Sequence, residues 1–336
     1  MIIDFILNNI IGNNRSSIEC QSADEWRRFT LNILVMGGTS FVSKVFAMYA
    51  IELGYTVDIF TRGKNEIDYE GVRNHIVGDR HSKEDLLQVN AYVYDYIVDI
   101  NAYTKDDVKL LAENVQKHNL KRYVLCSTAS VYMAPEKEQM ISEQSPVGYD
   151  AFFGGDYGLN KLEAEEYLFA SDIDTTVFRP TYIYGEHNNV YRDAFLFDSI
   201  KRGRITVLED SCHVNFIYVK DLVKSFESCF HVAASVNQAY NLANDEKITW
   251  STWLKAGLDA CGEDVEVKTY RWEDAKNLED QVFPFAGVDM LLDTQKLKAH
   301  GLHVPKTTFS TGIKNAFEWY QSVDPSVVDK RRFELI

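Results

Sequence analysis

A tyrosine and a lysine four residues apart are the pair in this sequence best suited to proton transfer. Tyr157 and Lys161 stand in the run YGLNK, at the start of a helix predicted over residues 157–170. Residues four apart share one helical face, so both side chains can reach a common ligand. A free phenol titrates at about pH 10, and a neighbouring ammonium group favours its ionised form. Tyr157 could therefore exchange a proton with a substrate hydroxyl, with Thr128 donating a hydrogen bond to the same oxygen.

A glycine turn follows the first predicted strand. The strand covers residues 32–36. The run GGTSFVS follows at residues 37–43, and its last three residues begin a helix predicted from residue 41. In such a turn, backbone N–H groups and the helix N-terminus can meet a pyrophosphate. Against the pattern GxxGxxG the three positions are Gly37, Ser40 and Ser43, so serine replaces two glycines. Taken alone, these residues are nearly as compatible with a plain strand–helix turn.

The end of the second predicted strand discriminates between two cofactors. An acid at this point binds the ribose of NAD, whereas an arginine accommodates the 2′-phosphate of NADP. Here residues 55–60 run into Thr61-Arg62-Gly63-Lys64, and Asp58 lies inside the strand. The missing acid and the added cation favour NADP, with NAD still possible. Arg62 and Lys64 could also be solvated loop charges.

The elements that would position these residues alternate between strands and helices. Strands are predicted at residues 32–36, 55–60, 75–77, 95–100, 121–127, 175–179 and 238–242, and helices at residues 41–53, 106–119 and 157–170. This alternation predicts an α/β fold, a Rossmann-type doubly wound parallel sheet with a smaller C-terminal substrate lobe. Ligands are then expected at the carboxyl ends of the strands.

The same pattern divides the chain into three parts. Residues 1–30 read as an N-terminal extension. Residues 31–185 and 215–243 would form the dinucleotide-binding Rossmann domain, and residues 186–214 and 244–336 the substrate-binding lobe. After residue 185, only residues 238–242 are predicted as a strand.

Composition excludes several classes of protein. The 336 residues include 35 Lys and Arg against 50 Asp and Glu, a net charge of −15, which disfavours binding to nucleic acid. The five cysteines form no CxxC pair, as expected for reduced thiols in the cytoplasm, and no metal site is expected. The N-terminus has no basic start or cleavage site, and no apolar stretch approaches the length of about 18 residues that spans a membrane.

Six short motifs, in a fixed order, resemble the extended short-chain dehydrogenase/reductases of the NAD-dependent epimerase/dehydratase family. They are GGTSFVS, Gly78-Asp79, STASVY at 127–132, YGLNK at 157–161, RPTYIYG at 179–185 and FIYVKDL at 216–222. The resemblance implies a Rossmann fold, a nicotinamide cofactor and a small polar substrate such as a nucleotide sugar. It also implies a homodimer, with the helix of Tyr157 and Lys161 contributing to a four-helix interface.

The resemblance further implies roles for single residues. Thr128, Tyr157 and Lys161 would be catalytic, with Lys161 lowering the pKa of Tyr157 and holding the nicotinamide ribose. Arg62 would meet the ribose phosphate and Asp79 the adenine. The full set expected at the cofactor is Gly37, Gly38, Thr39, Ser40, Phe41, Val42, Arg62, Asp79, Lys161 and Arg179. Tyr184, His187 and His213 lie near the expected substrate mouth, although packing is the commoner role for such residues.

One departure from the family pattern and two alternative functions limit this interpretation. Sugar dehydratases of the family place an Asp-Glu pair directly after the strand-end threonine, where this chain has Ala129 and Ser130. That argues against a dehydratase and leaves a reductase and an epimerase open, with an NADP-type pocket favouring net reduction. The alternatives are a non-catalytic NADP-binding sensor and an RNA-binding protein, since the branch of the family that contains chloroplast stem-loop binding proteins is associated with RNA.

Overall fold

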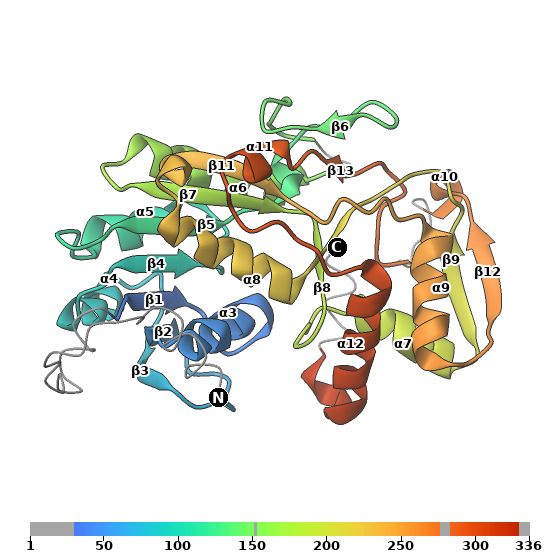
Figure 1. The fold of residues 1–336 in the computed structure, drawn as a ribbon, viewed down its shortest axis with the longest axis horizontal. Coiled ribbons are helices and arrows are strands. Elements are labelled where there is room, and N and C mark those ends of the chain that lie inside the picture. Colours follow the sequence, from blue (N-terminus) through green and yellow to red (C-terminus); the bar gives the residue numbers. More distant parts are fainter. Residues whose placement is uncertain (1–29, 151–152, 276–282, 329–336) are drawn as a thin grey trace, which may run out of the picture. The chain divides into compact units, whose positions relative to one another are not determined.

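Seven parallel strands form the central sheet of the computed structural model, which describes residues 30–150, 153–275 and 283–328 (Figure 1). Their order is β11-β7-β5-β4-β1-β2-β3. The strands are β1 (Asn32–Met36), β2 (Thr56–Thr61), β3 (Val72–Val77), β4 (Tyr96–Asp99), β5 (Arg122–Cys126), β7 (Thr175–Pro180) and β11 (Gln238–Leu242). The predicted Rossmann-type sheet is therefore confirmed. The extension predicted at residues 1–30 lies almost wholly outside the described residues.

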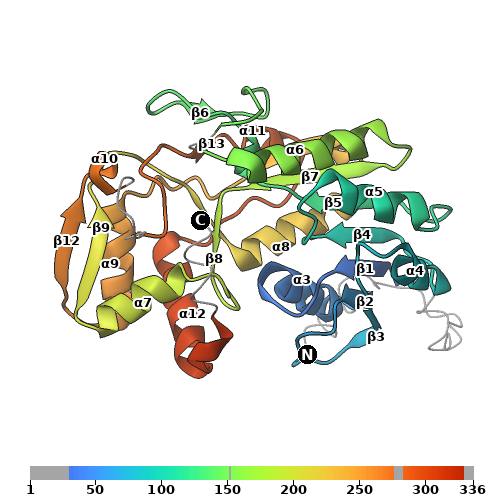
Figure 2. The same ribbon diagram turned by 180° about the vertical axis from the view of Figure 1, so that it is seen from behind.

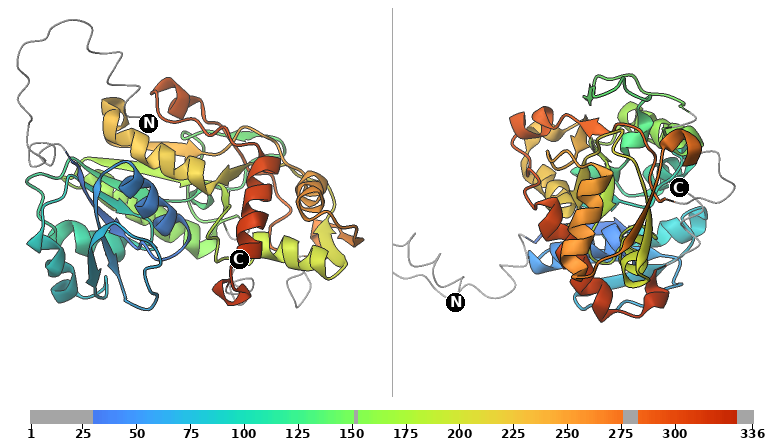
Figure 3. Two further views of the ribbon diagram at one scale, coloured as in Figure 1. Left: turned by 60° about the horizontal axis from the view of Figure 1, so that its bottom comes forward. Right: turned by 90° about the vertical axis from the view of Figure 1, so that its right-hand side faces the viewer.

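Helices cover both faces of this sheet, which explains why the strands are apolar runs without alternation. On one face lie α3 (Phe41–Glu52) and α8 (Val219–Ser228). There the Phe226 ring packs 6.3 Å from Phe46 and 5.0 Å from Phe178, between ring centroids. The other face is covered by α4 (Lys83–Leu86), α5 (Lys105–Asn114) and α6 (Gly155–Ala170). Figures 2 and 3 show the two layers of helices from other directions.

The strand order reverses between β1 and β4, which run in parallel side by side. Val35 of β1 lies opposite Ile59 of β2 on one side and Val98 of β4 on the other. The loops that leave β1 and β4 therefore diverge to opposite faces and open a crevice at the carboxyl ends of the strands. In sheets of this kind, ligands bind at that point.

The C-terminal part contains more strands than the sequence predicted. Three additional parallel pairs form: β8 (Tyr182–Tyr184) with β10 (Phe216–Tyr218), β9 (Arg204–Leu208) with β12 (Glu266–Tyr270), and β6 (Met140–Ile141) with β13 (Leu291–Leu292). The expectation of a single strand after residue 185 was thus wrong. Most of β12 is exposed and β13 has two residues, so neither carries the buried apolar run that marks the central strands. The division into a Rossmann domain and a lobe stays a prediction.

The remaining helices surround these pairs. They are α7 (Asp193–Lys201), α9 (Trp250–Cys261), α10 (Trp272–Ala275), α11 (Gln295–Ala299) and α12 (Phe309–Ser322), with 3₁₀ turns at Leu87–Ala91, Ala129–Val131, Cys229–His231, Ala233–Ser235 and Pro325–Val327. An aromatic core holds this part together. The fully buried Trp250 stacks on Phe285 at 5.2 Å, and Phe285 meets the Tyr182 ring edge-on at 4.9 Å. Among the helices described, none is both long and apolar enough to cross a membrane.

A glycine lets α6 approach the loop after β5 very closely. A Cβ atom on Gly158 would lie only 1.9 Å from the carbonyl oxygen of Ser130, in the 3₁₀ turn Ala129–Val131. A Cβ on Gly154 would lie 2.0 Å from the same oxygen. Because that atom belongs to the backbone, no side-chain rotation relieves the overlap. Glycine at these positions therefore sets the distance between Thr128 and the helix that carries Tyr157.

We predict that Gly158→Ala destabilises the protein. The added methyl group must push α6 away from the Ser130 carbonyl, which should lower the free energy of unfolding by about 1–3 kcal/mol. Urea unfolding followed by circular dichroism measures this. Glu163→Ala, on the exposed side of the same helix, is the control and should change stability by less than about 0.5 kcal/mol. Equal stability of the two variants would contradict the close packing.

Candidate active site

A pocket of about 300 Å³ opens at the carboxyl ends of the central strands. Four of its walls are the segments that follow β1, β4, β5 and β7, and α6 and residues from the C-terminal part complete it. The lining residues are Ser40, Phe41, Val42, Ser43, Ile100, Asn101, Tyr103, Cys126, Ser127, Thr128, Ala129, Ser130, Tyr157, Lys161, Pro180, Thr181, Tyr182, Ile183, Asn189, Val190, Arg192 and Met290. The pocket thus lies at the reversal of strand order.

Thr128, Tyr157 and Lys161 all line this pocket. Lys161 is buried, and its Nζ donates a hydrogen bond of 2.8 Å to the carbonyl oxygen of Cys126, at the end of β5. The same Nζ lies 6.0 Å from the centre of the Tyr157 ring and 5.4 Å from that of Tyr103. The structure therefore brings the three predicted catalytic residues together.

The hydroxyl of Tyr157 is held by the hydroxyl of Thr128. The backbone N–H of Ser130 donates to the Thr128 Oγ1 at 3.2 Å, which leaves the Thr128 hydroxyl to donate to Tyr157. Burial, with a smaller contribution from nearby Cys126, raises the pKa of Tyr157 to about 12, against the lowering effects of the Thr128 hydrogen bond and the charge of Arg192. The Tyr157 ring itself is 44% exposed, so the burial concerns the hydroxyl end. At neutral pH this phenol is protonated and able to donate.

The glycine turn adopts a conformation that glycine alone permits easily. Gly37 and Gly38 have φ of 106° and 122°. Ser40, by contrast, is extended with φ of −150°, so its side chain costs nothing there. The Ser43 hydroxyl donates to the Ser40 carbonyl at 2.8 Å and fills the space where a Cβ of Gly37 would be. The two serines that depart from GxxGxxG thus fit the turn without distorting it.

A dinucleotide would meet a suitable cradle at this turn. The backbone of Gly37, Gly38 and Thr39 leads into Ser40, Phe41 and Val42 at the start of α3, where N–H groups without helical partners favour phosphate. Phe41 has φ of 39°, an uncommon value for a residue with a side chain, and such strain is concentrated at functional sites. The shape and donors of the turn fit a pyrophosphate.

Arg62 and Asp79 lie close enough to interact at the ends of β2 and β3. Both are exposed. The backbone N–H of His81 holds the pKa of Asp79 below its usual range, and the charge of Arg62 adds to this effect. The two residues predicted at the adenosine end of a dinucleotide are therefore neighbours on one edge of the crevice.

Arg179 is buried away from the pocket lining. Its guanidinium pairs with Glu165 of α6 at 2.6 Å and donates to the Tyr132 hydroxyl at 3.0 Å. Glu165 in turn accepts a hydrogen bond from Ser127. These contacts tie β7 and α6 to the end of β5, directly behind the lining residues.

Tyr184, His187 and His213 also lie outside the residues that line the pocket. Tyr184 is buried between aromatic rings, including Phe309 at 5.0 Å. The His187 ring packs on Trp319 at 5.3 Å, and burial lowers the pKa of His187 to about 4. The backbone N–H of His213 donates to Asp289 at 2.7 Å. The structure does not bring these three residues to the predicted catalytic trio of Thr128, Tyr157 and Lys161.

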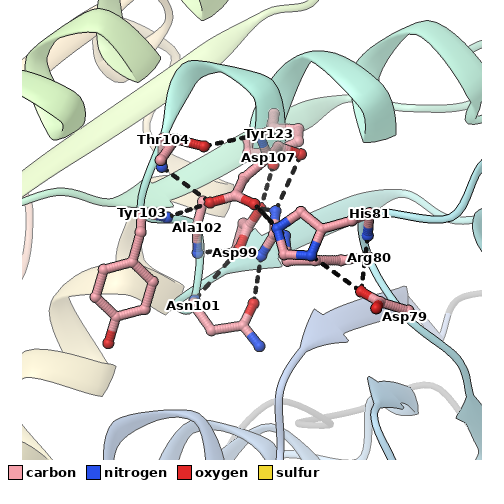
Figure 4. A network of polar contacts seen from close by, with 10 residues as sticks. All are labelled: Asp79, Arg80, His81, Asp99, Asn101, Ala102, Tyr103, Thr104, Asp107 and Tyr123. Carbon is pink, nitrogen blue, oxygen red and sulfur yellow. Dashed lines mark hydrogen bonds and ion pairs between the residues drawn. The ribbon is translucent and has the colours of Figure 1, made fainter.

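Sequence reasoning missed a buried ionic network beside the pocket (Figure 4). Arg80 donates to Asp99 at the end of β4 at 2.8 Å and to Asn101 at 2.5 Å, and its Nε lies 3.4 Å from Asp107 on α5. His81 bridges Asp79 and Asp107 at 3.0 Å and 2.8 Å. The network ties the loop that carries Asp79 to the pocket residue Asn101. The run Gly78-Asp79-Arg80 was the available signal, but nothing in it reveals which acids Arg80 meets.

The sequence also gave no signal for the pocket residues from the C-terminal part. They are Asn189, Val190, Arg192 and Met290. Within the described ranges, no group of three or more His, Cys, Asp and Glu side chains is placed to hold a metal ion.

Comparison with protein families identifies the chain. The family model of the NAD dependent epimerase/dehydratase family matches residues 33–243, a stretch that includes the glycine turn and all three residues of the trio. The chain belongs to this family. The resemblance seen in six short motifs is thereby confirmed.

Individual relatives are distant. The chloroplast stem-loop binding protein of 41 kDa b of Arabidopsis thaliana is 26% identical over 79% of this chain and 73% of its own length. Among solved structures, the UDP-glucose 4-epimerase of Thermotoga maritima with UDP-glucose superposes with a TM-score of 0.73 at 18% identity, over 87% of this chain and 99% of that one. The Bordetella bronchiseptica enzyme WbmG, in complex with NAD and UDP, gives 0.73 at 17% identity, over 89% and 97%. These two likenesses establish the fold.

We predict that Arg80→Met destabilises the protein strongly. It would leave the fully buried carboxylate of Asp99 without its ion pair, at a cost of about 3–5 kcal/mol in the free energy of unfolding. The matched control is Arg271→Met, which breaks an exposed, solvent-screened Arg–Asp pair and should leave the free energy of unfolding nearly unchanged. Urea unfolding at neutral pH measures both, and equal losses would contradict the network.

The pH dependence of stability tests the same network independently. Burial of Asp107 opposes its ionisation, but the charge of Arg80 and backbone N–H groups outweigh this and lower its pKa. A carboxylate with a lowered pKa stabilises the fold above its unfolded pKa of about 4, and this contribution is lost as the pH falls. In Arg80→Met the folded-state pKa of Asp107 should rise towards or above its unfolded value, so this part of the stability loss on acidification should become smaller than in the wild type or disappear, as measured by urea unfolding at a series of pH values.

Proposed function

We propose that this protein is an NAD(P)-dependent epimerase or reductase, acting on a carbonyl or carbinol of a small polar substrate such as a nucleotide sugar. The observation that carries the proposal is the convergence of Thr128, Tyr157 and Lys161 in one pocket with the residues that follow the glycine turn. Tyr157 is its acid/base residue. Membership of the epimerase/dehydratase family and the likeness to an enzyme crystallised with NAD and UDP support it.

The nicotinamide cofactor would supply and accept hydride when bound. Gly38, Thr39, Ser40, Phe41 and Val42 would hold its pyrophosphate through backbone N–H groups and the start of α3. Gly37, whose N–H donates to the Phe60 carbonyl oxygen at 2.9 Å, would shape the turn. Asp79 would accept a hydrogen bond from the adenine, and Lys161 would reach the nicotinamide ribose. Arg179 would act from behind the pocket, by holding α6 through Glu165.

Tyr157 would transfer the proton. Its raised pKa keeps the phenol protonated at neutral pH, which suits donation to a carbonyl oxygen as that oxygen gains negative charge. The Thr128 hydroxyl orients the phenol and stabilises the phenolate that remains. A protonated Tyr157 favours net reduction, in which the phenol gives its proton to the substrate. An epimerase would use the same residues, with Tyr157 first accepting a proton and later returning it.

The cofactor is NADP under this proposal. The tip of β2 offers the exposed cations Arg62 and Lys64 and no acid, and Arg62 lies near Asp79, the residue assigned to adenine. An arginine recognises phosphate through paired hydrogen bonds. RNA binding and a purely sensing role are not favoured, because neither needs a phenol hydrogen-bonded to a threonine inside a pocket.

We expect the purified protein to bind NADPH more tightly than NADH in calorimetric titrations run side by side. Arg62→Ala should weaken NADPH binding by about 10- to 100-fold and leave NADH binding nearly unchanged, since a charge-assisted hydrogen bond is lost only for the 2′-phosphate. Lys83→Ala, another exposed cation of the same region, is the control. A preference for NADH would refute the role of Arg62, and binding of neither would put RNA binding or a scaffold role first.

The hydrogen bond from Thr128 should be visible in the pH profile of alcohol oxidation. The rate rises with pH as more Tyr157 becomes phenolate, and Thr128→Val removes the bond that lowers the pKa of Tyr157. The variant should therefore reach a given rate only at higher pH, with a loss of about 10- to 100-fold at neutral pH. Thr128→Ser should restore both rate and profile. An unshifted profile in Thr128→Val would show that Thr128 does not act on Tyr157.

A further inference from the structure

We propose that His81 is the positioning residue for Asp79, and that through Asp79 it makes the cofactor site prefer adenine to a purine with an oxygen at C6. The proposal rests on the proposed function, which assigns Asp79 to the adenine. It adds a second residue, which acts through Asp79, and the discrimination between bases that the pair provides. Both side chains are exposed, 57% for Asp79 and 69% for His81, in the segment that follows β3.

Two nitrogen atoms of His81 hold one oxygen of the Asp79 carboxylate. The backbone N–H of His81 donates to Oδ1 of Asp79 at 2.9 Å, and the ring nitrogen Nδ1 lies 3.0 Å from the same oxygen. The second oxygen, Oδ2, makes no hydrogen bond to any of the described residues. An aspartate side chain otherwise rotates over a broad range about its last bond. Two contacts to Oδ1 therefore fix where Oδ2 lies and leave it available to a ligand.

A buried acid fixes the His81 ring from its other side (Figure 4). The ring nitrogen Nε2 lies 2.8 Å from Oδ1 of Asp107, a side chain that is only 4% exposed. The other oxygen of Asp107 accepts hydrogen bonds from the backbone N–H groups of Tyr103 at 2.7 Å and Thr104 at 2.9 Å, at the start of α5. The ring thus bridges a rigid, buried carboxylate and the exposed carboxylate of Asp79. The ordering cost of binding a base at Asp79 is reduced before the ligand arrives.

The backbone of Asp79 is held separately, by the start of α4. Its N–H donates to the Asp85 carboxylate at 2.8 Å, and its carbonyl oxygen accepts from the Ser82 N–H at 3.0 Å. Ser82 is the N-cap of α4, and its hydroxyl accepts from the Asp85 N–H at 3.2 Å. None of these contacts involves the His81 ring. Removing the ring therefore releases the carboxylate of Asp79 while its backbone stays in place.

The protonation of both groups determines which base the site accepts. The backbone N–H of His81, and to a smaller extent its ring, lower the pKa of Asp79, so Asp79 is a carboxylate at neutral pH and can only accept hydrogen bonds. A protonated histidine ring donates from both nitrogens and can serve both carboxylates at once. Adenine has an amino group at C6, which donates, whereas hypoxanthine has a carbonyl oxygen there. A fixed carboxylate oxygen binds the first and repels the second, as in other sites built around one hydrogen-bonding group.

The test is calorimetric titration of the full chain with NADPH and with its analogue in which hypoxanthine replaces adenine. If the wild type binds NADH more tightly, the corresponding NADH pair is used. The wild type should prefer adenine by about 10- to 100-fold. His81→Leu removes the ring donors but keeps the backbone N–H, and should reduce this preference by about 3- to 10-fold. His81→Gln keeps a side-chain donor and should recover part of it. A general loosening of the fold would weaken both ligands alike and leave the preference unchanged.

Two further variants separate this proposal from the proposed function. His118→Leu replaces another exposed histidine, beyond the end of α5, and should keep the preference of the wild type. Asp79→Asn should abolish the preference, which tests the role of Asp79 itself. Loss of the preference in Asp79→Asn but not in His81→Leu overturns the role of His81 alone. A preference that survives Asp79→Asn, or a wild type that binds neither dinucleotide, contradicts the proposed function and removes the role of His81 with it.

Discussion

The contact between α6 and the turn after β5 is the constraint on which the pocket depends. Gly158 has no Cβ, so the helix can lie directly against the Ser130 carbonyl. That approach brings Tyr157 to Thr128, and Lys161, one turn further along, to the Cys126 carbonyl at the strand end. The buried ion pair of Arg179 with Glu165 secures the same helix from behind. Thr128, Tyr157 and Lys161 are thus positioned by backbone geometry, which side-chain motion cannot relax.

Electrostatics then decides what the positioned groups can do. The phenol of Tyr157 sits in a pocket lined by two cations and by no acid of the described residues, yet burial raises the pKa of Tyr157 by more than the Thr128 hydrogen bond and the charge of Arg192 lower it. Acidic residues lie just outside, where Arg80 holds Asp99 and Asp107 in the network beside the pocket. An overall negative charge thus coexists with a pocket lined by two cations, and the carboxylates of Asp99 and Asp107 beside it are paired with Arg80.

The sequence predicted the parts of the molecule whose signals are local. Short runs rich in apolar, β-branched and aromatic residues located all seven central strands, although β3 starts at Val72, ahead of the predicted residues 75–77. The spacing of Tyr157 and Lys161 placed both on one helical face. The missed features depend on contacts between distant segments: β9 pairs with β12 across some sixty residues, and Arg192 reaches the pocket only through the fold of the C-terminal part. For the same reason the motif containing Tyr184 could not reveal that its ring packs on Phe309, or that Ser43 fills the space above Gly37.

The central claim, that Tyr157 moves a proton while hydride moves in the same pocket, is tested most directly by single-turnover absorbance of the reduced nicotinamide. The protein, loaded with stoichiometric NADPH or NADP⁺, is mixed with a panel of sugar nucleotides and small carbonyl compounds, beside Tyr157→Phe loaded in the same way. The account predicts a change in nicotinamide absorbance with at least one substrate in the wild type, slowed by about 100-fold or more in the variant although cofactor still binds. Hydride transfer at equal rates in both proteins would contradict it.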